Sequence, residues 1–186
     1  LSWWWIAGLA AAAAASLPIV WQFMHEYQKN RVYQFLNPDS DPLGSGWQTI
    51  QSKIAVGSGG LSGKGWTHGT QSQLEFLPER HTDFVLAVFS EEFGWIGVAL
   101  LMLVYAFVVG RSLWIATNAR DSYGRLLGGA IAMTFFTYIL VNSAMITGLM
   151  PVKGVPLPLI SYGGTSAVSL LIAFGILMSV HAHRRA

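Results

Sequence analysis

The chain of 186 residues has 11% charged and 53% apolar residues, whereas an average globular domain is roughly 25% charged, so a soluble enzyme, a disordered tail and a fibrous protein are excluded. Its net charge of +2, with no run of Lys or Arg, argues against nucleic acid binding. The absence of cysteine excludes disulfides, thiolate catalysis and cysteine-based metal sites.

An apolar stretch of about 20 residues is long enough to cross a bilayer as a helix. Four stretches lack Asp, Glu, Lys and Arg over 18 residues or more: Leu1–Met24, Phe93–Gly110, Leu126–Val152 and Gly154–Val180. The predicted fold class is therefore all-α, a polytopic membrane protein with four transmembrane helices. These helices are expected at about residues 1–23, 84–109, 126–148 and 161–180.

Basic residues gather in two segments outside these helices: Arg111, Arg120 and Arg125 in 110–125, and Arg184 and Arg185 in the tail 181–186. Short basic segments stay in the cytoplasm. The segments 24–83 and 149–160 are then extracytoplasmic, and this alternation fits both basic clusters at once. Because the chain begins at Leu1 without an initiator Met, we interpret it as the later part of a longer protein.

The extracytoplasmic segment 24–83 is far longer than a simple connection, which is typical of a functional loop. In chain order we expect a helix-like stretch, turns, a short amphipathic helix and a glycine-rich segment: His25–Phe35, Asn37–Pro42, Gln48–Ala55 and Gly57–Gly69. The glycines do not fit a Walker A nucleotide loop, since Ser58 stands at its first glycine position and Gly65 at its Ser/Thr position. Two interpretations remain for them: turns alone, or backbone lying close to a lipid headgroup.

The segment Leu74–Phe84 is the most polar part of the membrane boundary, with six ionisable or hydroxyl residues among eleven. Asp83 stands directly before the apolar run that opens the second helix. Carboxylates at a membrane boundary are costly to desolvate and usually serve ions, protons or substrate. Asp83 is therefore a candidate general base acting on a hydroxyl group. The alternative is a helix cap, in which Thr82 or Asp83 accepts hydrogen bonds from backbone N–H groups.

Glu91 and Glu92 follow about 12 Å further along the same helix. They either form a structural ion pair with a cation of another helix or have a catalytic role. The segment Met150–Gly164 contains three prolines and three glycines, and irregular backbone at membrane depth is tolerated only inside protein or beside a water-filled cavity. Lys153 within it either meets a phosphate or extends to the interface. Together these segments suggest an outward-facing polar cavity with one base and one cation.

Several motifs in a fixed order resemble the SEDS family (shape, elongation, division and sporulation). They are Gly57–Gly60, Leu77–Phe84, Glu91–Gly94 and Gly154–Gly164. The rod-shape type, RodA, fits better than the division type, FtsW, through Asn37–Pro42 and Gly63–Gln71. Members of the family have ten membrane helices, so the resemblance implies that this chain holds the last four and the large extracytoplasmic loop.

The resemblance implies a peptidoglycan glycosyltransferase that polymerises lipid II into β-1,4 glycan strands for cell-wall elongation and cell shape. It also implies a class B penicillin-binding protein (a transpeptidase) as partner and a place in the bacterial inner (cytoplasmic) membrane, with the active site on the outer face. Membrane lipids are expected partners, and nucleic acid is not. Two other functions remain open: a flippase for a lipid-linked precursor, with Glu91 and Glu92 along its path, or a non-catalytic scaffold for a partner synthase.

Functional residues of the family motifs fall on the same segments. The family's essential aspartate corresponds to Asp83, which we predict to be catalytic, and Glu75 matches a further acidic position implicated in function. The candidate substrate-binding residues are Glu75, Glu79, Arg80, His81, Lys153 and Ser161, and the predicted intramembrane polar residues are Glu91 and Glu92. Lys153 resembles the lysine of the division type, whereas many rod-shape relatives have an apolar residue there. A divalent cation (Mg²⁺ or Mn²⁺) held by Asp83 and Glu75 is the candidate cofactor, and no organic cofactor is expected.

Overall fold

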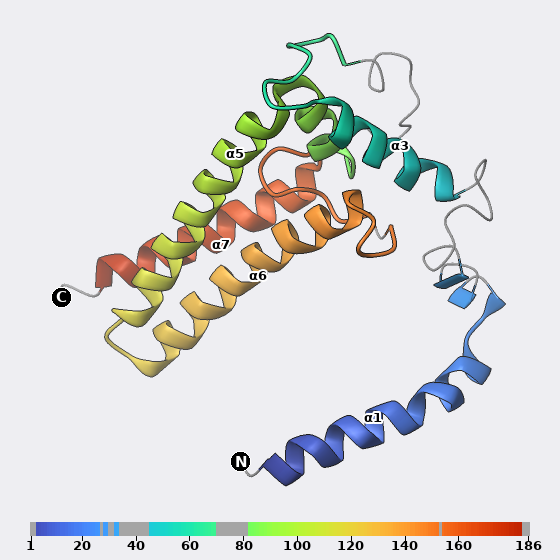
Figure 1. Ribbon diagram of the computed structural model, residues 1–186. Coiled ribbons are helices and arrows are strands. Elements are labelled where there is room, and N and C mark those ends of the chain that lie inside the picture. The colour runs from blue at the N-terminus through green and yellow to red at the C-terminus, as the bar shows by residue number, and fades with distance from the viewer. Residues whose placement is uncertain are drawn as a thin grey trace.

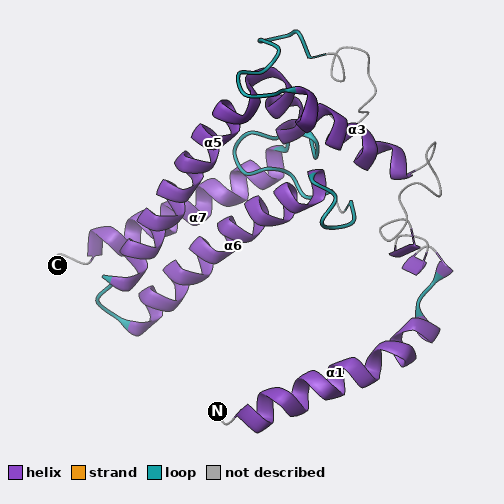
Figure 2. Cartoon of the chain, in the orientation of Figure 1, coloured by secondary structure: helices purple, strands orange, loops and turns teal. Residues whose placement is uncertain are grey.

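The computed structural model describes residues 3–26, 28–29, 32–33, 45–69, 82–152 and 154–183. Within these ranges the chain forms helices and connecting loops, with no strand (Figure 2). The main helices of these ranges are α1 (Trp3–Phe23), α3 (Ser45–Ser58), α5 (Val85–Thr117), α6 (Ser122–Ile146) and α7 (Gly164–Ala182). Figure 1 shows α5, α6 and α7 packed as a bundle, with α3 at one end of it and α1 apart.

Small residues let the helices of the bundle approach closely, as is common between helices in membranes. At Gly128 of α6, an added Cβ would lie 3.0 Å from the Cβ of Ala116 on α5. One turn earlier, a Cβ on Gly124 would lie 3.3 Å from Val180 on α7. Asp121 caps the start of α6, because its carboxylate accepts a hydrogen bond from Gly124 N at 3.0 Å. The short connection between α5 and α6 therefore closes tightly.

Three helices of the described chain are long and apolar enough to cross a membrane: Val85–Thr117, Ser122–Ile146 and Gly164–Ala182. Their outer faces expose large apolar side chains, among them Leu103, Phe107 and Leu171. Such exposure is costly in water but suits a lipid environment. The helix α1 covers the first predicted span, although its apolar part, Trp3–Ser16, is shorter than the other three candidates.

The helices differ at their ends from the predicted spans. The helix α5 continues to Thr117, where the sequence suggested an end near residue 109, and α7 begins at Gly164 instead of Ser161. The helix α3 contains the predicted amphipathic stretch and extends it on both sides. Where the membrane boundaries lie along these helices stays a prediction, and the predicted turns at Asn37–Pro42 lie outside the described residues.

The two ends of the bundle carry different groups. At one end α5 passes into α6, and α7 ends near the C-terminus (Figure 1). Arg120 and Arg125 belong to this end, and Arg125 Nε donates to Ala119 O at 3.1 Å. At the other end, α3 and the loop residues 59–69, 147–152 and 154–163 gather around the start of α5. Asp83 therefore lies at the opposite end of the bundle from this basic segment.

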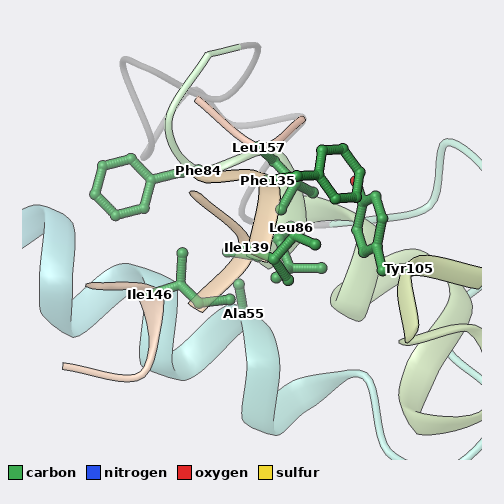
Figure 3. Packing of buried hydrophobic residues seen from close by; sticks show 9 residues of the cluster. Ala55, Phe84, Leu86, Tyr105, Phe135, Ile139, Ile146 and Leu157 are labelled. Atoms are coloured by element: carbon green, nitrogen blue, oxygen red, sulfur yellow. The ribbon is translucent and has the colours of Figure 1, made fainter. Parts of the chain in front are cut away.

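The core begins where α3 meets the start of α5 and the end of α6, and it extends into the middle of the bundle (Figure 3). Its buried side chains include Ala55, Phe84, Leu86, Tyr105, Phe135, Ile139, Ile146 and Leu157. The ring of Phe135 lies edge-to-face with Tyr105 and Phe174, at centroid distances of 5.8 Å and 5.2 Å. Tyr105 Oη donates to Pro158 O at 2.7 Å. The core thereby fixes the loop 154–161 to the bundle beside Phe84.

Candidate functional site at the start of α5

Asp83 is half-buried and directly precedes the fully buried Phe84. The capping position of α5 falls on Phe84, which makes no side-chain capping hydrogen bond. The first turn closes through the backbone, with Ala87 N donating to Phe84 O at 2.9 Å. Asp83 thus stands one residue before the cap, and the position of its carboxylate depends on how the backbone of residues 82–84 is held.

Asn142 of α6 holds the backbone of Asp83 from one side. Its Nδ2 donates to Asp83 O at 2.9 Å and to Val155 O at 2.7 Å. The side chain is 0% exposed, so water does not compete for these hydrogen bonds. One carboxamide therefore joins three segments: α6, the residue before α5, and the loop that follows Gly154.

Ser161 holds the neighbouring carbonyl. Its Oγ donates to Thr82 O at 2.5 Å and accepts a hydrogen bond from Leu157 N at 2.8 Å. The backbone of the same loop also approaches the carboxylate, because a Cβ placed on Gly154 would lie 3.3 Å from Asp83 Oδ2. The predicted site residues Asp83 and Ser161 are therefore brought together, because Ser161 binds the carbonyl of Thr82, the residue before Asp83.

A surface cavity of about 640 Å³ opens beside this site. Its lining residues are Val85, Ile160, Ser161, Tyr162, Gly163, Gly164 and Ala167. Val85 stands two residues after Asp83, and Ser161 binds the carbonyl of Thr82, so the cavity opens close to the segment that carries Asp83, although Asp83 does not line it. Most of this lining is apolar, which suits a lipid-linked ligand better than a free sugar.

The other predicted substrate-binding residues lie outside the described part of the chain: Glu75, Glu79, Arg80, His81 and Lys153. Their roles stay predictions. Where the structure describes the chain, no group of three or more His, Asp or Glu side chains could hold a metal ion. Of the predicted metal pair only Asp83 is described, so the divalent cation also stays a prediction.

Glu91 is 0% exposed, and its Oε1 accepts a hydrogen bond from Lys64 Nζ at 2.6 Å. Ion pairing was one of the two roles considered for Glu91, but the cation comes from the glycine-rich segment and not from another helix. Glu92 is half-buried. Both acids precede a break in α5, and the helical residues after it, 95–117, rise about 35 Å, enough to cross a bilayer core of about 30 Å. Glu91 and Glu92 therefore lie toward the end of the helix where α3 packs, and not midway along it.

The break is at Gly94, whose φ of 66° and ψ of −165° are not helical. A break leaves carbonyls before it and N–H groups after it without helical partners. The glycine-rich segment satisfies both sets through four hydrogen bonds: Lys64 N to Glu91 O (3.0 Å), Gly65 N to Glu92 O (3.0 Å), Trp95 N to Gly60 O (2.9 Å) and Ile96 N to Leu61 O (3.1 Å). The segment therefore replaces the missing hydrogen bonds of the helix.

This contact brings backbone against backbone. A Cβ on Gly59 would lie 2.0 Å from Ser90 O, one on Gly63 would lie 2.0 Å from Glu92 O, and one on Gly94 would lie 2.3 Å from Gly63 N. Neither sequence interpretation of the glycines, turns alone or contact with a headgroup, included this packing against a helix. The glycines are needed because no side chain fits between the two backbones.

Sequence reasoning missed two residues of this region. Asn142 is an amide within the uncharged run Leu126–Val152, and a buried amide in a membrane helix is itself a signal of a hydrogen-bonding role. Lys64 is the one basic residue in the glycine-rich segment Gly57–Gly65, which could have been paired with the acids at Glu91 and Glu92.

A family model for FtsW, RodA and SpoVE, described as "Cell cycle protein", matches residues 1–186, the whole chain. The chain belongs to the FtsW/RodA/SpoVE family. This confirms the family resemblance, and with it the prediction of an all-α polytopic membrane protein.

Curated relatives of this family member include "Peptidoglycan glycosyltransferase MrdB" of Escherichia coli (strain K12). That protein is 54% identical over 186 residues, which are 100% of this chain and 50% of the relative. "Peptidoglycan glycosyltransferase RodA" of Treponema pallidum is 42% identical over 158 residues, covering 85% of this chain and 36% of the relative. The chain spans half or less of the length of these two relatives.

Solved structures agree with the assignment. One, described as "Structural coordination of polymerization and crosslinking by a peptidoglycan synthase complex", matches with a TM-score of 0.76 and 35% identity. It covers 96% of this chain and 48% of the matched chain. The crystal structure of the Thermus thermophilus rod shape determining protein RodA matches with a TM-score of 0.54 and 27% identity, covering 95% of this chain and 57% of that one.

Proposed function

We propose that this chain is part of a peptidoglycan glycosyltransferase that polymerises lipid II into β-1,4 glycan strands for cell-wall elongation and cell shape. The observation that carries the proposal is the 54% identity, over the whole chain, to a curated peptidoglycan glycosyltransferase. The surroundings of Asp83 support it, because a carboxylate beside a largely apolar cavity at one end of a membrane bundle suits chemistry on a lipid-anchored sugar. The enzyme acts in the bacterial inner membrane, with this site on the outer face.

In the proposed reaction, Asp83 removes the proton from the 4-hydroxyl of the acceptor GlcNAc. The hydroxyl oxygen attacks C1 of the donor MurNAc, the C1–O bond to pyrophosphate breaks, and undecaprenyl pyrophosphate leaves. The new bond is β, since the displacement inverts C1. A single inverting displacement needs a base but no covalent carboxylate nucleophile. Asp83 passes the proton to water before the next turnover.

The leaving pyrophosphate gains negative charge, which fixed cations would stabilise. Lys153 and Arg80 are our candidates for this role, and Glu75, Glu79 and His81 are candidates for orienting the sugar. A divalent cation bound near Asp83 would supply positive charge at the same point. The cavity lined by Val85 and Ser161 is our candidate for the part of the site that receives the lipid-linked end of a substrate.

We also propose a class B penicillin-binding protein as the partner that cross-links the new strands. The similarity to a peptidoglycan synthase complex, described as coordinating polymerization and crosslinking, supports this part of the proposal. The flippase alternative depended on Glu91 and Glu92 lining a path. Glu91 is instead buried against Lys64 at the helix break, so no observation favours that alternative.

The test compares Asp83→Asn with Asp121→Asn in the full-length natural protein, purified in detergent with its partner synthase. Asn keeps the shape of Asp but cannot act as a base, and at Asp121 it preserves the helix cap at the far end of the bundle. With purified lipid II, we expect glycan polymer from the native protein and from Asp121→Asn, and at least a 100-fold loss, about the contribution of a general base, from Asp83→Asn.

Two results would contradict the proposal in different ways. Equal polymer from Asp83→Asn and the native protein, with both folded, would remove Asp83 as the base and leave the enzyme class standing. No polymer from the native protein, with or without its partner, would remove the glycosyltransferase itself and favour a transport assay for lipid II.

A further inference from the structure

Asn142 is a buried amide that connects two distant segments of backbone. It lies in α6, one turn before the end of the helix at Ile146, and is 0% exposed. Both acceptors that face its amide nitrogen are backbone carbonyls, one 59 residues earlier in the chain and the other 13 residues later. A carbonyl can only accept, so a single group that bonds to both carbonyls needs two donor hydrogens. The carboxamide supplies them from one atom.

The oxygen of the same carboxamide is buried and has no hydrogen-bond partner among the residues the structure describes. An unpaired buried acceptor is costly, and an apolar side chain of similar size would avoid that cost. The amide is therefore kept for what its nitrogen holds. It holds the carbonyl of Asp83, the residue whose carboxylate lies beside Gly154 of the facing loop.

Holding this carbonyl fixes the direction of the Asp83 side chain. Asp83 precedes the helix, so its backbone torsions are not set by helical hydrogen bonds. Asn142 joins the peptide after Asp83 to Val155, and Ser161 joins the peptide before it to the same loop. With both flanking peptides held, the Cα–Cβ bond of Asp83 keeps one direction relative to the loop 154–161, which limits where its carboxylate can lie. A reacting group displaced by about 1 Å can lose about 100-fold in rate.

We propose that Asn142 is a positioning residue for the glycosyl transfer, acting through the backbone of Asp83 and not by contact with substrate. This rests on the proposed function, in which Asp83 is the base. A positioning residue of this kind affects the chemical step and leaves the binding of lipid II nearly unchanged.

The first measurement is steady-state polymerisation of lipid II by the full-length protein carrying Asn142→Ala, with thermal unfolding followed in parallel. We expect kcat to fall about 10- to 100-fold, while KM for lipid II changes less than about 3-fold. The matched control is Asn118→Ala. Asn118 Nδ2 also donates to a backbone carbonyl, that of Trp114 at 2.8 Å, but it is exposed and lies at the far end of α5. Asn118→Ala should leave kcat unchanged.

The second measurement does not depend on activity. The chain has no cysteine, so Asp83→Cys introduces one thiol into it, and cysteines elsewhere in the full-length protein are replaced by serine. The rate at which a maleimide labels this thiol reports how the side chain of residue 83 is presented. We expect Asn142→Ala to change that rate at least about 5-fold, and Asn118→Ala to leave it unaltered.

Asn142→Gln replaces Asn142→Ala if the alanine variant does not accumulate as folded protein. It keeps the donor group but moves it by one methylene, and we expect the same direction of change. Unchanged kcat and labelling in a folded variant would overturn the proposal, and so would a raised KM with unchanged kcat, which would make Asn142 a substrate-binding residue. If the native protein makes no polymer, the proposed function fails, and the labelling rates alone decide whether Asn142 positions residue 83.

Discussion

The segment from Thr82 to Ile96 is held at its two ends by different means. At the start, side chains of Asn142 and Ser161 bind the carbonyls of Asp83 and Thr82. At the break, the backbone of the glycine-rich segment binds the backbone on both sides of Gly94. A side-chain contact can be removed by one substitution without forcing two backbones apart. Where two backbones touch without space for a Cβ, any side chain added at a glycine must push them apart. Substitutions at the break should therefore destabilise the protein far more than substitutions at Asn142 or Ser161.

The largest loss of unfolding free energy is expected where the backbone of the glycine-rich segment lies closest to the backbone of α5. In Gly63→Ala, the new Cβ would lie 2.0 Å from Glu92 O, and the residue has a φ of 77°, which disfavours alanine. Strain and overpacking together should cost about 2 to 6 kcal/mol of unfolding free energy. Thermal unfolding of the full-length protein in detergent measures this.

The control for Gly63→Ala is Gly57→Ala, within α3. There a Cβ would meet no atom of the described residues within 4 Å, and alanine favours a helix over glycine by about 0.5 to 1 kcal/mol. We expect Gly57→Ala to be neutral or slightly stabilising. Equal melting temperatures for the two variants would mean that the glycine-rich segment is not packed against α5.

The next largest loss of unfolding free energy is expected at the ion pair of Lys64 and Glu91, beside the break at Gly94. Glu91 is 0% exposed, whereas the side chain of Lys64 is 29% exposed and can still reach water. Lys64→Met leaves a buried carboxylate without this partner and should cost about 3 to 5 kcal/mol. Glu91→Gln leaves a lysine that water can solvate, so its cost should be smaller. The double variant should be more stable than Lys64→Met alone.

Lys29→Met is the control for this pair, because the salt bridge of Lys29 with Glu26 spans 3.5 Å and the Glu26 side chain is 85% exposed. Removing it should cost less than about 1 kcal/mol. If the two single changes at Lys64 and Glu91 add without coupling in the double variant, the pair does not stabilise the break.

The sequence predicted the helices because they depend on local signals, and the same kind of signal drew attention to Asp83, whose catalytic role stays a prediction. Apolar runs give helices, and an acidic residue before such a run is visible without any tertiary contact. The break at Gly94 was not predicted, since its hydrogen-bonding partners lie about thirty residues earlier and Gly94 is one of several glycines in an apolar run. The role of Asn142 was missed for the same reason: its two acceptors come from segments that meet only in the folded protein.

The smallest loss of unfolding free energy is expected at Ser52, which connects α3 to the end of α6. Its Oγ is within hydrogen-bond distance of Ile146 O (3.0 Å), at the end of the helix that carries Asn142 one turn earlier, and of Thr49 O (2.9 Å) in its own helix. The carbonyls that end a helix lack helical donors, so Ser52 satisfies one of them from α3. Ser52→Ala should cost about 0.5 to 1.5 kcal/mol.

Hydrogen exchange is the measurement that separates Ser52 from its neighbours, because it reports each helix individually. We expect Ser52→Ala to raise exchange in α3 and in the last turn of α6, and to leave α7 unchanged. The control is Ser58→Ala, where the exposed hydroxyl donates to Ala55 O of its own helix at 3.1 Å and joins no second element among the described residues. If Ser52→Ala raises exchange in α3 alone, the end of α6 is held by its own helix, and the position of Asn142 does not depend on α3. If exchange rises in both, loosening α3 also loosens the helix that positions Asp83.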